Sequence, residues 1–170
     1  MIFGLSPNIS TDGILKAGTD VLPLRSNIPE ISKFDYYAID QSFYNRAIEN
    51  QKNYKGFCVI AGDNYAQGSS REHAALAPKY LGQKFTIAKS YARIGWQNLI
   101  NFGIIPFEFK NPADWNKLEQ GDVLRIDNIR ETIKNSDSIT ATVGGKGTEI
   151  QLAFNISNRQ VEIILKGGII

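Results

Sequence analysis

Two serines and an arginine, Ser69, Ser70 and Arg71, stand where a polar loop leads into a helix-forming segment. The loop begins at Gly62, directly after the apolar run 57–61, whose composition indicates a buried strand. The first turn of a helix presents backbone N–H groups without intrahelical acceptors, and the helix dipole makes this end positive. Hydroxyl and guanidinium groups at such a place suit carboxylate binding and the stabilisation of an oxyanion. The sequence therefore places the candidate functional site here.

Two other interpretations of this motif need to be weighed. Ser69 and Glu72 have the spacing of a helix capping box, which would account for these two residues without any function. A capping box explains neither the second serine, nor the arginine, nor the long polar loop. A Ser–His–Asp hydrolase would have to use His73, the only histidine, yet the G-x-S-x-G nucleophile elbow is missing. We expect His73 to be a structural hydrogen-bonding residue.

The remaining chemistry-bearing patterns are weak. The glycine-rich segment 144–148 lacks the spacing of a phosphate loop and lies between two β segments, so it predicts a hairpin turn. No cluster of His, Cys and carboxylates has metal-ligand spacing. The single cysteine, Cys58, lies in the apolar strand, excludes a chain-internal iron–sulfur site, and is expected to be a small buried hydrophobic residue.

Length and charge limit the classes of protein that fit. A chain of 170 residues predicts one domain, residues 1–170, with a core of its own. A net charge of +2 does not call for nucleic acid or an anionic membrane surface. No apolar run approaches the roughly 18 residues of a membrane helix, and the start lacks a signal-peptide pattern. These observations predict a cytoplasmic protein without a membrane partner.

Hydrophobic periodicity and turn residues predict an α/β fold. Strands are predicted at 2–5, 14–15, 57–61, 84–88, 104–109, 123–126, 139–143, 148–154 and 160–165. Helices are predicted at 31–38, 41–51, 71–81 and 92–102, with a helical turn at 114–118. The central alternation of strand and helix favours a parallel βαβ core. The strand-rich tail predicts an antiparallel β unit packed beside that core.

The loop motif and its neighbours resemble the C-terminal swivel domain of the aconitase family. The resemblance rests on the G-S-S-R-E-H-A core within 62–76 and on segments in matching order and spacing, at 8–12, 22–27, 88–94, 98–106 and 121–122. It covers nearly the whole chain. Small subunits of isopropylmalate isomerase and homoaconitase share the core. They usually carry a nearby cysteine and proline and lack a counterpart of 22–27, so the resemblance favours the aconitase branch.

This resemblance implies a swivelling β/β/α domain and a role in hydro-lyase chemistry. Aconitases interconvert citrate and isocitrate through cis-aconitate, using a [4Fe–4S] cluster held by three cysteines of other domains. By matching position, Ser69 is the base that removes a proton next to a carboxylate. Ser70 and Arg71 match contacts to substrate carboxylates and to the oxyanion site, and Arg25 matches the family's other swivel-domain arginine.

The implied partners follow from the lack of cluster ligands. With only Cys58, the chain needs cluster-bearing aconitase domains or a large subunit, so it is expected to be a small subunit or a piece of a longer chain. The expected substrate is a tricarboxylate, and the isolated chain is expected to be inactive. The alternative is a non-catalytic binding module derived from the fold, with RNA as its ligand. The low net charge gives weak attraction for RNA.

The chain departs from the family pattern at four positions. It has Gly13 and Gly95 where the family usually has histidines, Lys16 near a usual proline, and Ala66 at a usual loop glycine. None of these is a residue to which the resemblance assigns catalysis. Together they indicate a divergent member, and altered substrate choice or weak activity is a hypothesis to test.

Overall fold

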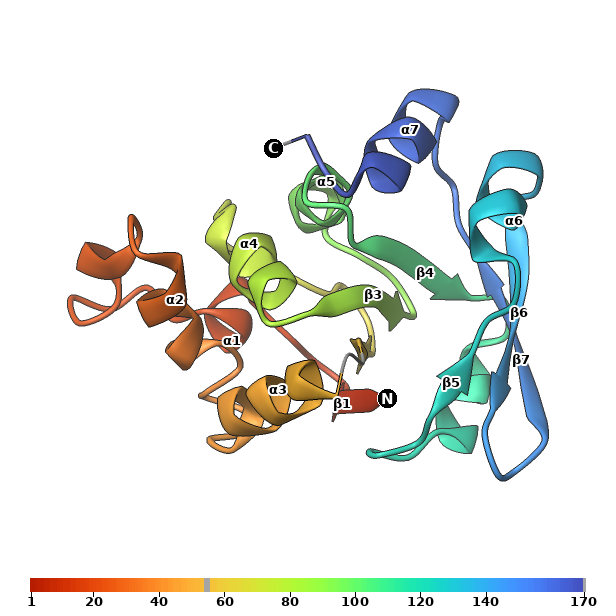
Figure 1. The fold of residues 1–170 in the computed structure, drawn as a ribbon, viewed down its shortest axis with the longest axis horizontal. Coiled ribbons are helices and arrows are strands. Elements are labelled where there is room, and N and C mark those ends of the chain that lie inside the picture. Colours follow the sequence, from red (N-terminus) through yellow and green to blue (C-terminus); the bar gives the residue numbers. More distant parts are fainter. Residues whose placement is uncertain (54–55, 170) are drawn as a thin grey trace.

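The computed structural model describes residues 1–53 and 56–169 and contains one mixed sheet of seven strands (Figure 1). The strands are β1 (Ile2–Ser6), β2 (Phe57–Ala61), β3 (Gln83–Ala88), β4 (Ile105–Phe109), β5 (Leu124–Arg125), β6 (Ser138–Val143) and β7 (Thr148–Ala153). Their order in the sheet is β1-β2-β3-β4-β7-β6-β5. The predicted α/β class is confirmed.

The first four strands of the sheet, β1 to β4, pair in parallel. The predicted strands at 57–61, 84–88 and 104–109 all belong to this half and agree with the structure within one residue. All five residues of β2 are buried, which is why this strand is continuously apolar rather than alternating. The carboxyl ends of these strands lie at one edge of the sheet, and the polar loop after β2 begins at that edge.

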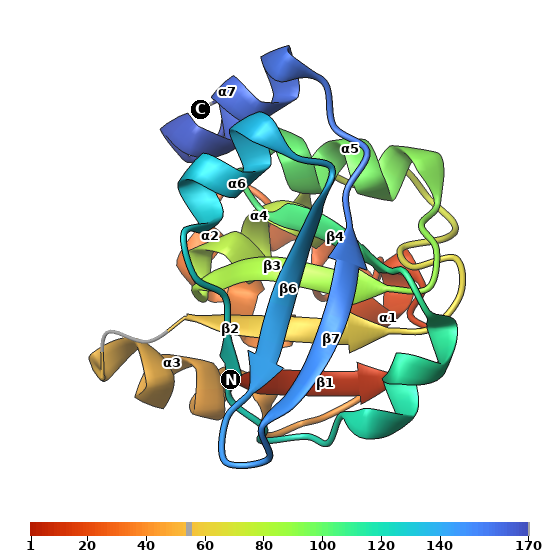
Figure 2. The same cartoon turned by 90° about the vertical axis from the view of Figure 1, so that its right-hand side faces the viewer.

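The last three strands form the predicted antiparallel unit, and the glycine-rich segment 144–147 is the hairpin turn between β6 and β7. This unit does not pack beside the parallel sheet as expected. It continues the same sheet, because β7 pairs antiparallel with β4. Figure 2 shows β6 and β7 crossing in front of the parallel strands at a steep angle, so the sheet is strongly curled.

Helices lie on both sides of this curled sheet. They are α1 (Thr11–Ile14), α2 (Ile28–Ile31), α3 (Phe43–Lys52), α4 (His73–Tyr80), α5 (Arg93–Asn101), α6 (Ile129–Asn135) and α7 (Asn158–Lys166), with short 3-10 helices η1 (Leu22–Leu24), η2 (Ser32–Phe34) and η3 (Pro112–Lys117). The buried apolar residues form two clusters. One includes residues of α1 to α5, and the other includes the inner face of the curl with α6 and α7. No helix in the described part of the chain is long and apolar enough to cross a membrane.

The predicted strand at 160–165 is wrong, because this segment is helix α7. Ser157 accepts a hydrogen bond from the Gln160 backbone N–H and the Gln160 side chain returns to the Ser157 N–H, which is a true capping box. Val161 and Ile164 are buried three residues apart, which is the helical period. Gly167, at φ 93°, ends the helix in the left-handed conformation.

Differences in the other helices also have local causes. The predicted strand at 14–15 is wrong, because Ser10 caps α1 by accepting from the Gly13 N–H. The predicted helix at 31–38 is a single turn, α2, followed by η2, and it stops where Tyr36 adopts φ 52°. Helix α6 was not predicted. The capping box weighed as an alternative explanation of Ser69 and Glu72 does not form, because α4 begins at His73 and no side chain caps it.

Candidate functional site

The polar loop between β2 and α4 is tied to the two neighbouring chain connections by backbone hydrogen bonds. The Ala66 N–H donates to the Ile9 carbonyl at 2.7 Å on one side, and the Tyr65 N–H donates to the Ser90 carbonyl at 3.0 Å on the other. The Thr11 N–H donates to the Gln67 carbonyl at 2.9 Å. The loop is therefore held at both edges before it reaches the serines.

Gly62 and Tyr65 show why the loop has this sequence. A Cβ at Gly62 would collide with the Pro7 carbonyl, so the loop can leave β2 this close to the β1 connection only through glycine. Tyr65 is fully buried, and its ring packs edge-to-face on Tyr91 with centroids 5.8 Å apart. This aromatic contact fixes the loop against the connection that leads into α5.

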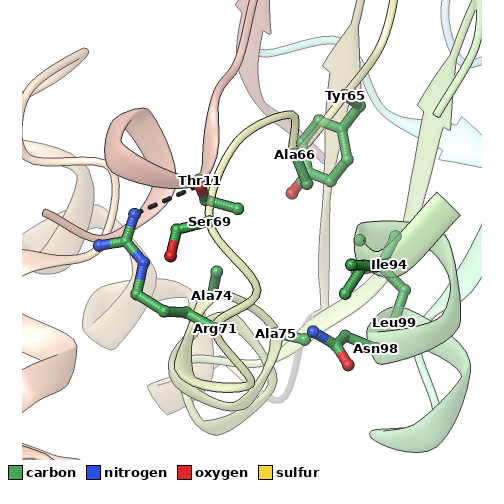
Figure 3. Close-up of a pocket in the computed structure, with 11 residues that line it drawn as sticks. Thr11, Tyr65, Ala66, Ser69, Arg71, Ala74, Ala75, Ile94, Asn98 and Leu99 are labelled. Carbon is green, nitrogen blue, oxygen red and sulfur yellow. Dashed lines mark hydrogen bonds between the residues drawn. The ribbon is translucent and has the colours of Figure 1, made fainter. Parts of the chain in front are cut away.

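Arg71 is the most constrained polar residue of the motif. Its side chain is only 14% exposed and points back under α1. Nη2 donates to the Thr11 hydroxyl at 3.2 Å (Figure 3) and to the Asp12 carboxylate at 2.7 Å, while Nη1 donates to the Leu15 carbonyl at 3.0 Å. The hydrogen bond from Arg71, and then one from the Ala17 backbone N–H, lowers the pKa of the Asp12 carboxyl. The guanidinium is thus locked in place by groups 56 to 60 residues away in sequence.

Arg71 also separates two cavities. A small cavity of about 10 Å³, room for one water molecule, is lined by Ser69, Arg71 and Thr11 among others. In Figure 3 the Ser69 hydroxyl lies on the same side of this cavity as Thr11 and the Arg71 guanidinium, with Ile94 and Asn98 opposite. A larger cleft of about 310 Å³ lies on the other side and is lined by Arg71, Ser70 and Arg25 among others.

The four predicted site residues therefore divide between these two spaces. Ser69 and Arg71 share the small cavity, whereas Arg25, Ser70 and Arg71 share the cleft. Neither of these two cavities is lined by both Ser69 and Arg25. Among the described residues, Arg71 is the one that lines both cavities.

Arg25 follows η1 at the mouth of the cleft and is exposed. Its guanidinium makes no hydrogen bond or ion pair with any residue that the structure describes. Its carbonyl lies 2.9 Å from Nε2 of His73. His73 therefore has the structural hydrogen-bonding role expected for it, since it joins the start of α4 to the turn that carries Arg25.

The start of α4 keeps the expected unsatisfied donors. Within the described residues, the backbone N–H groups of Ser70, Arg71 and Glu72 have no acceptor, and Ser70 and Glu72 are exposed. Helix α4 provides the positive dipole end behind them. Backbone donors and a guanidinium converge here, so the arrangement can hold a carboxylate.

Sequence reasoning missed the residues that hold Arg71, namely Thr11, Asp12 and the Leu15 carbonyl. Residues 8–12 entered only as a matching segment, without a role. No periodicity links Asp12 to Arg71, because they are 59 residues apart. The one signal in the sequence was that Asp12, an acidic residue, lies in the segment 8–12, which also matches the family.

The residues of this chain do not fit an iron–sulfur cluster. In the part of the chain that the structure describes, no three His, Cys, Asp or Glu side chains gather at metal-binding distance. Burial raises the pKa of the Cys58 thiol to about 12, so it stays protonated and is a poor ligand. Cys58 is fully buried in β2, as expected for a structural cysteine.

Comparison with known proteins gives consistent matches over this fold and site. Residues 19–112 match the family described as the aconitase C-terminal domain. A putative mitochondrial aconitate hydratase of Emericella nidulans is 44% identical over 55% of this chain and 11% of its own length. A mitochondrial aconitate hydratase of Gracilaria gracilis is 31% identical over 95% of this chain and 20% of its own length.

Proteins of a second kind match over most of their own length. A 3-isopropylmalate dehydratase small subunit of Hydrogenobaculum is 38% identical over 79% of this chain and 75% of that protein. The crystal structure of a 3-isopropylmalate dehydratase from Methanocaldococcus jannaschii superimposes with a TM-score of 0.76 at 29% identity. It covers 98% of this chain and 87% of that one.

Two consequences follow directly. The chain spans between 11% and 20% of the length of the mitochondrial aconitate hydratases named above. The expected cytoplasmic location is contradicted, because relatives from fungi, an alga, a nematode and a slime mould are named as mitochondrial proteins. Composition and charge could not have shown this, since they do not encode the compartment.

Proposed function

This chain belongs to the aconitase C-terminal domain family, and on that premise we propose that it is the swivel component of an aconitate hydratase-like hydro-lyase. In this proposal it supplies a serine base and carboxylate-binding arginines to an active site completed by other domains or by a large subunit. The substrate is a tricarboxylate that loses and regains water through cis-aconitate. The observation that carries the proposal is the cavity shared by Ser69 and the locked guanidinium of Arg71.

Ser69 is proposed to remove the proton from the carbon next to a substrate carboxylate. Its side chain is exposed at the end of the loop and makes no hydrogen bond to the described residues, so its oxygen is available to a substrate. A serine alkoxide is unstable in water and needs a positive group close by. Arg71 supplies that charge from a fixed position, which costs no reorganisation during the reaction.

Arg25, Ser70 and Arg71 are proposed to bind the substrate carboxylates in the cleft of about 310 Å³. The planar guanidinium of Arg25 suits bidentate binding of a carboxylate and has no partner of its own among the described residues. The unpaired N–H groups at the start of α4 face the same anion. Arg71 then joins carboxylate binding on one side to stabilisation of the Ser69 oxygen on the other.

A [4Fe–4S] cluster is proposed to be held outside this chain, by other domains or a large subunit. The residues described here do not form a site for the cluster. We therefore assign them no step of the reaction that takes place on the cluster. Their contribution is limited to binding, orientation and proton transfer.

A second candidate function is the small subunit of an isopropylmalate or homocitrate dehydratase. It is favoured by the small-subunit relative at 38% identity and by the superposition over 87% of a 3-isopropylmalate dehydratase chain. A homocitrate dehydratase of Saccharomyces cerevisiae is 36% identical over 66% of this chain. The same Ser69 and arginines would serve there, and only the substrate would differ.

The test is turnover of the enzyme assembled with its cluster-bearing partner, assayed on citrate, homocitrate and isopropylmalate. Ser69→Ala is expected to lower kcat by about 10²- to 10⁴-fold with little change in KM, because it removes the base and leaves the carboxylate contacts. Ser138→Ala is the matched control, since that serine lies on β6 and its hydroxyl bonds no described residue.

Each result decides between the proposals. Citrate turnover that is lost in Ser69→Ala supports the main proposal, and turnover of another substrate alone supports the second. Activity that survives in Ser69→Ala would remove the serine from its role. A loaded complex that turns over none of the three substrates would favour the non-catalytic binding module.

A further inference from the structure

A further cavity, separate from the two beside Arg71, lies at the opposite end of the parallel strands from the serine loop. It is lined by Lys84 and Phe85 at the start of β3, by Gly103 just before β4, and by side chains of α6 and α7, and it measures about 380 Å³. Figure 1 shows α6 and α7 grouped beyond β4, on the side away from α1 and α2. The serine loop follows the carboxyl end of β2, so the two sites do not overlap.

The lining of this cavity is mostly aliphatic and incompletely buried. Ile105 and Ile133 belong to the buried core, while Phe85, Ile129 and Leu165 are only partly covered. Contact between such side chains and water is unfavourable. A contiguous apolar surface that remains accessible often marks a binding site. A volume within the range of about 300–1,000 Å³ is typical of small-molecule sites.

Two cations also line the cavity, and neither is neutralised. Lys84 and Arg130 have no ion-pair partner among the described residues. The acids beside Arg130 are already paired, Asp127 with Arg125 at 2.9 Å and Glu131 with Lys134 at 3.3 Å.

A third cation strengthens the positive field at this place. Lys79 donates from Nζ to the carbonyl of Gly103 at 3.3 Å, and Gly103 lines the cavity. Burial, and then the charge of Lys84, lowers the pKa of Lys79. The two ammonium groups therefore repel each other, and an anion bound beside them would relieve this repulsion.

We propose that this cavity binds a medium-chain alkyl carboxylate. The alkyl chain lies between the start of β4 and helices α6 and α7, and the carboxylate lies between Lys84 and Arg130. The proposal follows from an aliphatic lining with unpaired positive charge and few other polar groups. It is independent of the Ser69 site and of the reaction proposed for it.

Decanoate is the probe, titrated calorimetrically into the whole chain. We expect saturable binding at one site, weakened by roughly tenfold in Lys84→Glu/Arg130→Glu. The matched control is Lys110→Glu/Arg159→Glu, the same charge change at two exposed positions outside the cavity. Methyl NMR shifts on adding decanoate are expected at Ile105, Ile133 and Ile164.

Several results would overturn the proposal. Equal weakening in both double variants would show non-specific charge attraction, and equal affinity for decyltrimethylammonium would show that the head group is not recognised. Methyl shifts confined to other parts of the chain would place binding elsewhere. Cosedimentation with anionic phospholipid vesicles in the absence of decanoate binding would assign the surface to a membrane instead.

Discussion

At the residue scale, the clearest contrast is between two ionisable side chains, Arg71, which is 14% exposed, and Asp35, which is fully buried. Arg71 is compensated by a carboxylate, a hydroxyl and a carbonyl, although its Nε has no partner among the described residues. Asp35 is fully buried, and neither of its carboxylate oxygens has a hydrogen-bond partner in the described part of the chain. An uncompensated carboxylate in such a place is very costly in free energy, so burial raises the pKa of Asp35 and favours its neutral form.

Asp35 lies beside a buried polar cluster that reaches the serine loop. It is adjacent in sequence to Tyr36, whose hydroxyl lies 2.6 Å from the hydroxyl of Tyr65. The Tyr36 hydroxyl also donates to Oε1 of Gln83 at 3.4 Å. Because Tyr65 belongs to the loop that carries Ser69, the state of this cluster bears on the stability of the site.

Asp35→Asn tests the protonation of this carboxyl through the pH dependence of stability. Burial raises the pKa of Asp35 well above its ordinary value. Above an unfolded pKa of about 3.9, the unfolded chain therefore binds fewer protons here than the folded chain. Stability conferred by the neutral group is present below that pH and is lost as pH rises toward the folded pKa, by up to about 1.4 kcal/mol per pH unit.

Urea unfolding between pH 4 and pH 8 measures this effect. The stability of Asp35→Asn relative to the unmodified chain should increase steadily with pH, because asparagine does not ionise. Asp137→Asn, at an exposed position on the loop before β6, is the control and should show no such increase. A pH-independent difference for Asp35→Asn would contradict the assignment of a protonated carboxyl.

At the scale of elements, two departures from the family pattern meet in space. Ala66 lies in the serine loop with φ 62°, a conformation that glycine adopts more easily. Gly95 lies in the first turn of α5, and a Cβ there would be 2.5 Å from the Cβ of Ala66. The missing side chain at Gly95 therefore leaves room for the methyl group of Ala66, and the two positions are coupled.

Substitution of Gly95 by alanine should have opposite effects in two backgrounds. With Ala66 present, the new methyl group overpacks the contact, and we expect Gly95→Ala to destabilise the chain by about 1–3 kcal/mol. In the Ala66→Gly background the 2.5 Å contact between the two Cβ atoms is removed, and the nearest remaining atom to the new methyl group is the carbonyl oxygen of residue 66 at 3.3 Å. We expect that small contact to be accommodated, so the higher helix propensity of alanine should stabilise α5 by up to about 1 kcal/mol.

A double-mutant cycle of unfolding free energies measures this coupling. If Gly95→Ala changes the free energy of unfolding equally in both backgrounds, helix propensity alone accounts for its effect. The serine loop and α5 would then not be in steric contact at these positions. Ala66→Gly by itself provides the reference, because it combines relief of the left-handed strain with loss of a buried methyl group.

At the scale of the whole molecule, the chain carries half of the proposed chemistry. It presents a serine, two arginines and the start of a helix at one edge of the sheet, but its described residues offer no cluster ligands. Its relatives include aconitate hydratases several times its length and a dehydratase subunit of similar length. A site built at this edge of the sheet would be completed by the rest of the chain in the long relatives and by a separate subunit in the short one.

The purified chain is accordingly predicted to fold but to show no turnover of citrate, homocitrate or isopropylmalate. Anaerobic reconstitution with iron and sulfide should leave no stoichiometric cluster on it, as measured by bound iron and visible absorbance. The same reconstitution with its cluster-bearing partner is the positive control. A stable cluster or turnover on the isolated chain would contradict the prediction.

Sequence patterns alone were enough to predict the family, the parallel core and the place of Ser69, Ser70 and Arg71 before a helix start. These depend on short-range patterns, namely a continuously apolar strand, a polar loop and a helix start. The prediction of a strand at 160–165 was wrong, because a short segment rich in valine and isoleucine also fits a strand. The cap at Ser157 and the helical burial of Val161 and Ile164 identify it as α7. Short apolar segments do not distinguish strand from helix, and tertiary burial decides between them.

The surroundings of the motif could be learned only from the folded chain. Three of its features join segments that are far apart in the chain. They are the ion pair between Asp12 and Arg71, the contact of Ala66 with Gly95, and the placement of Ser69 and Arg25 in different cavities. The direct antiparallel pairing of β7 with β4 likewise makes one sheet out of the two units that the sequence predicted. Such contacts arise from packing between elements, and no local periodicity encodes which distant side chains will meet.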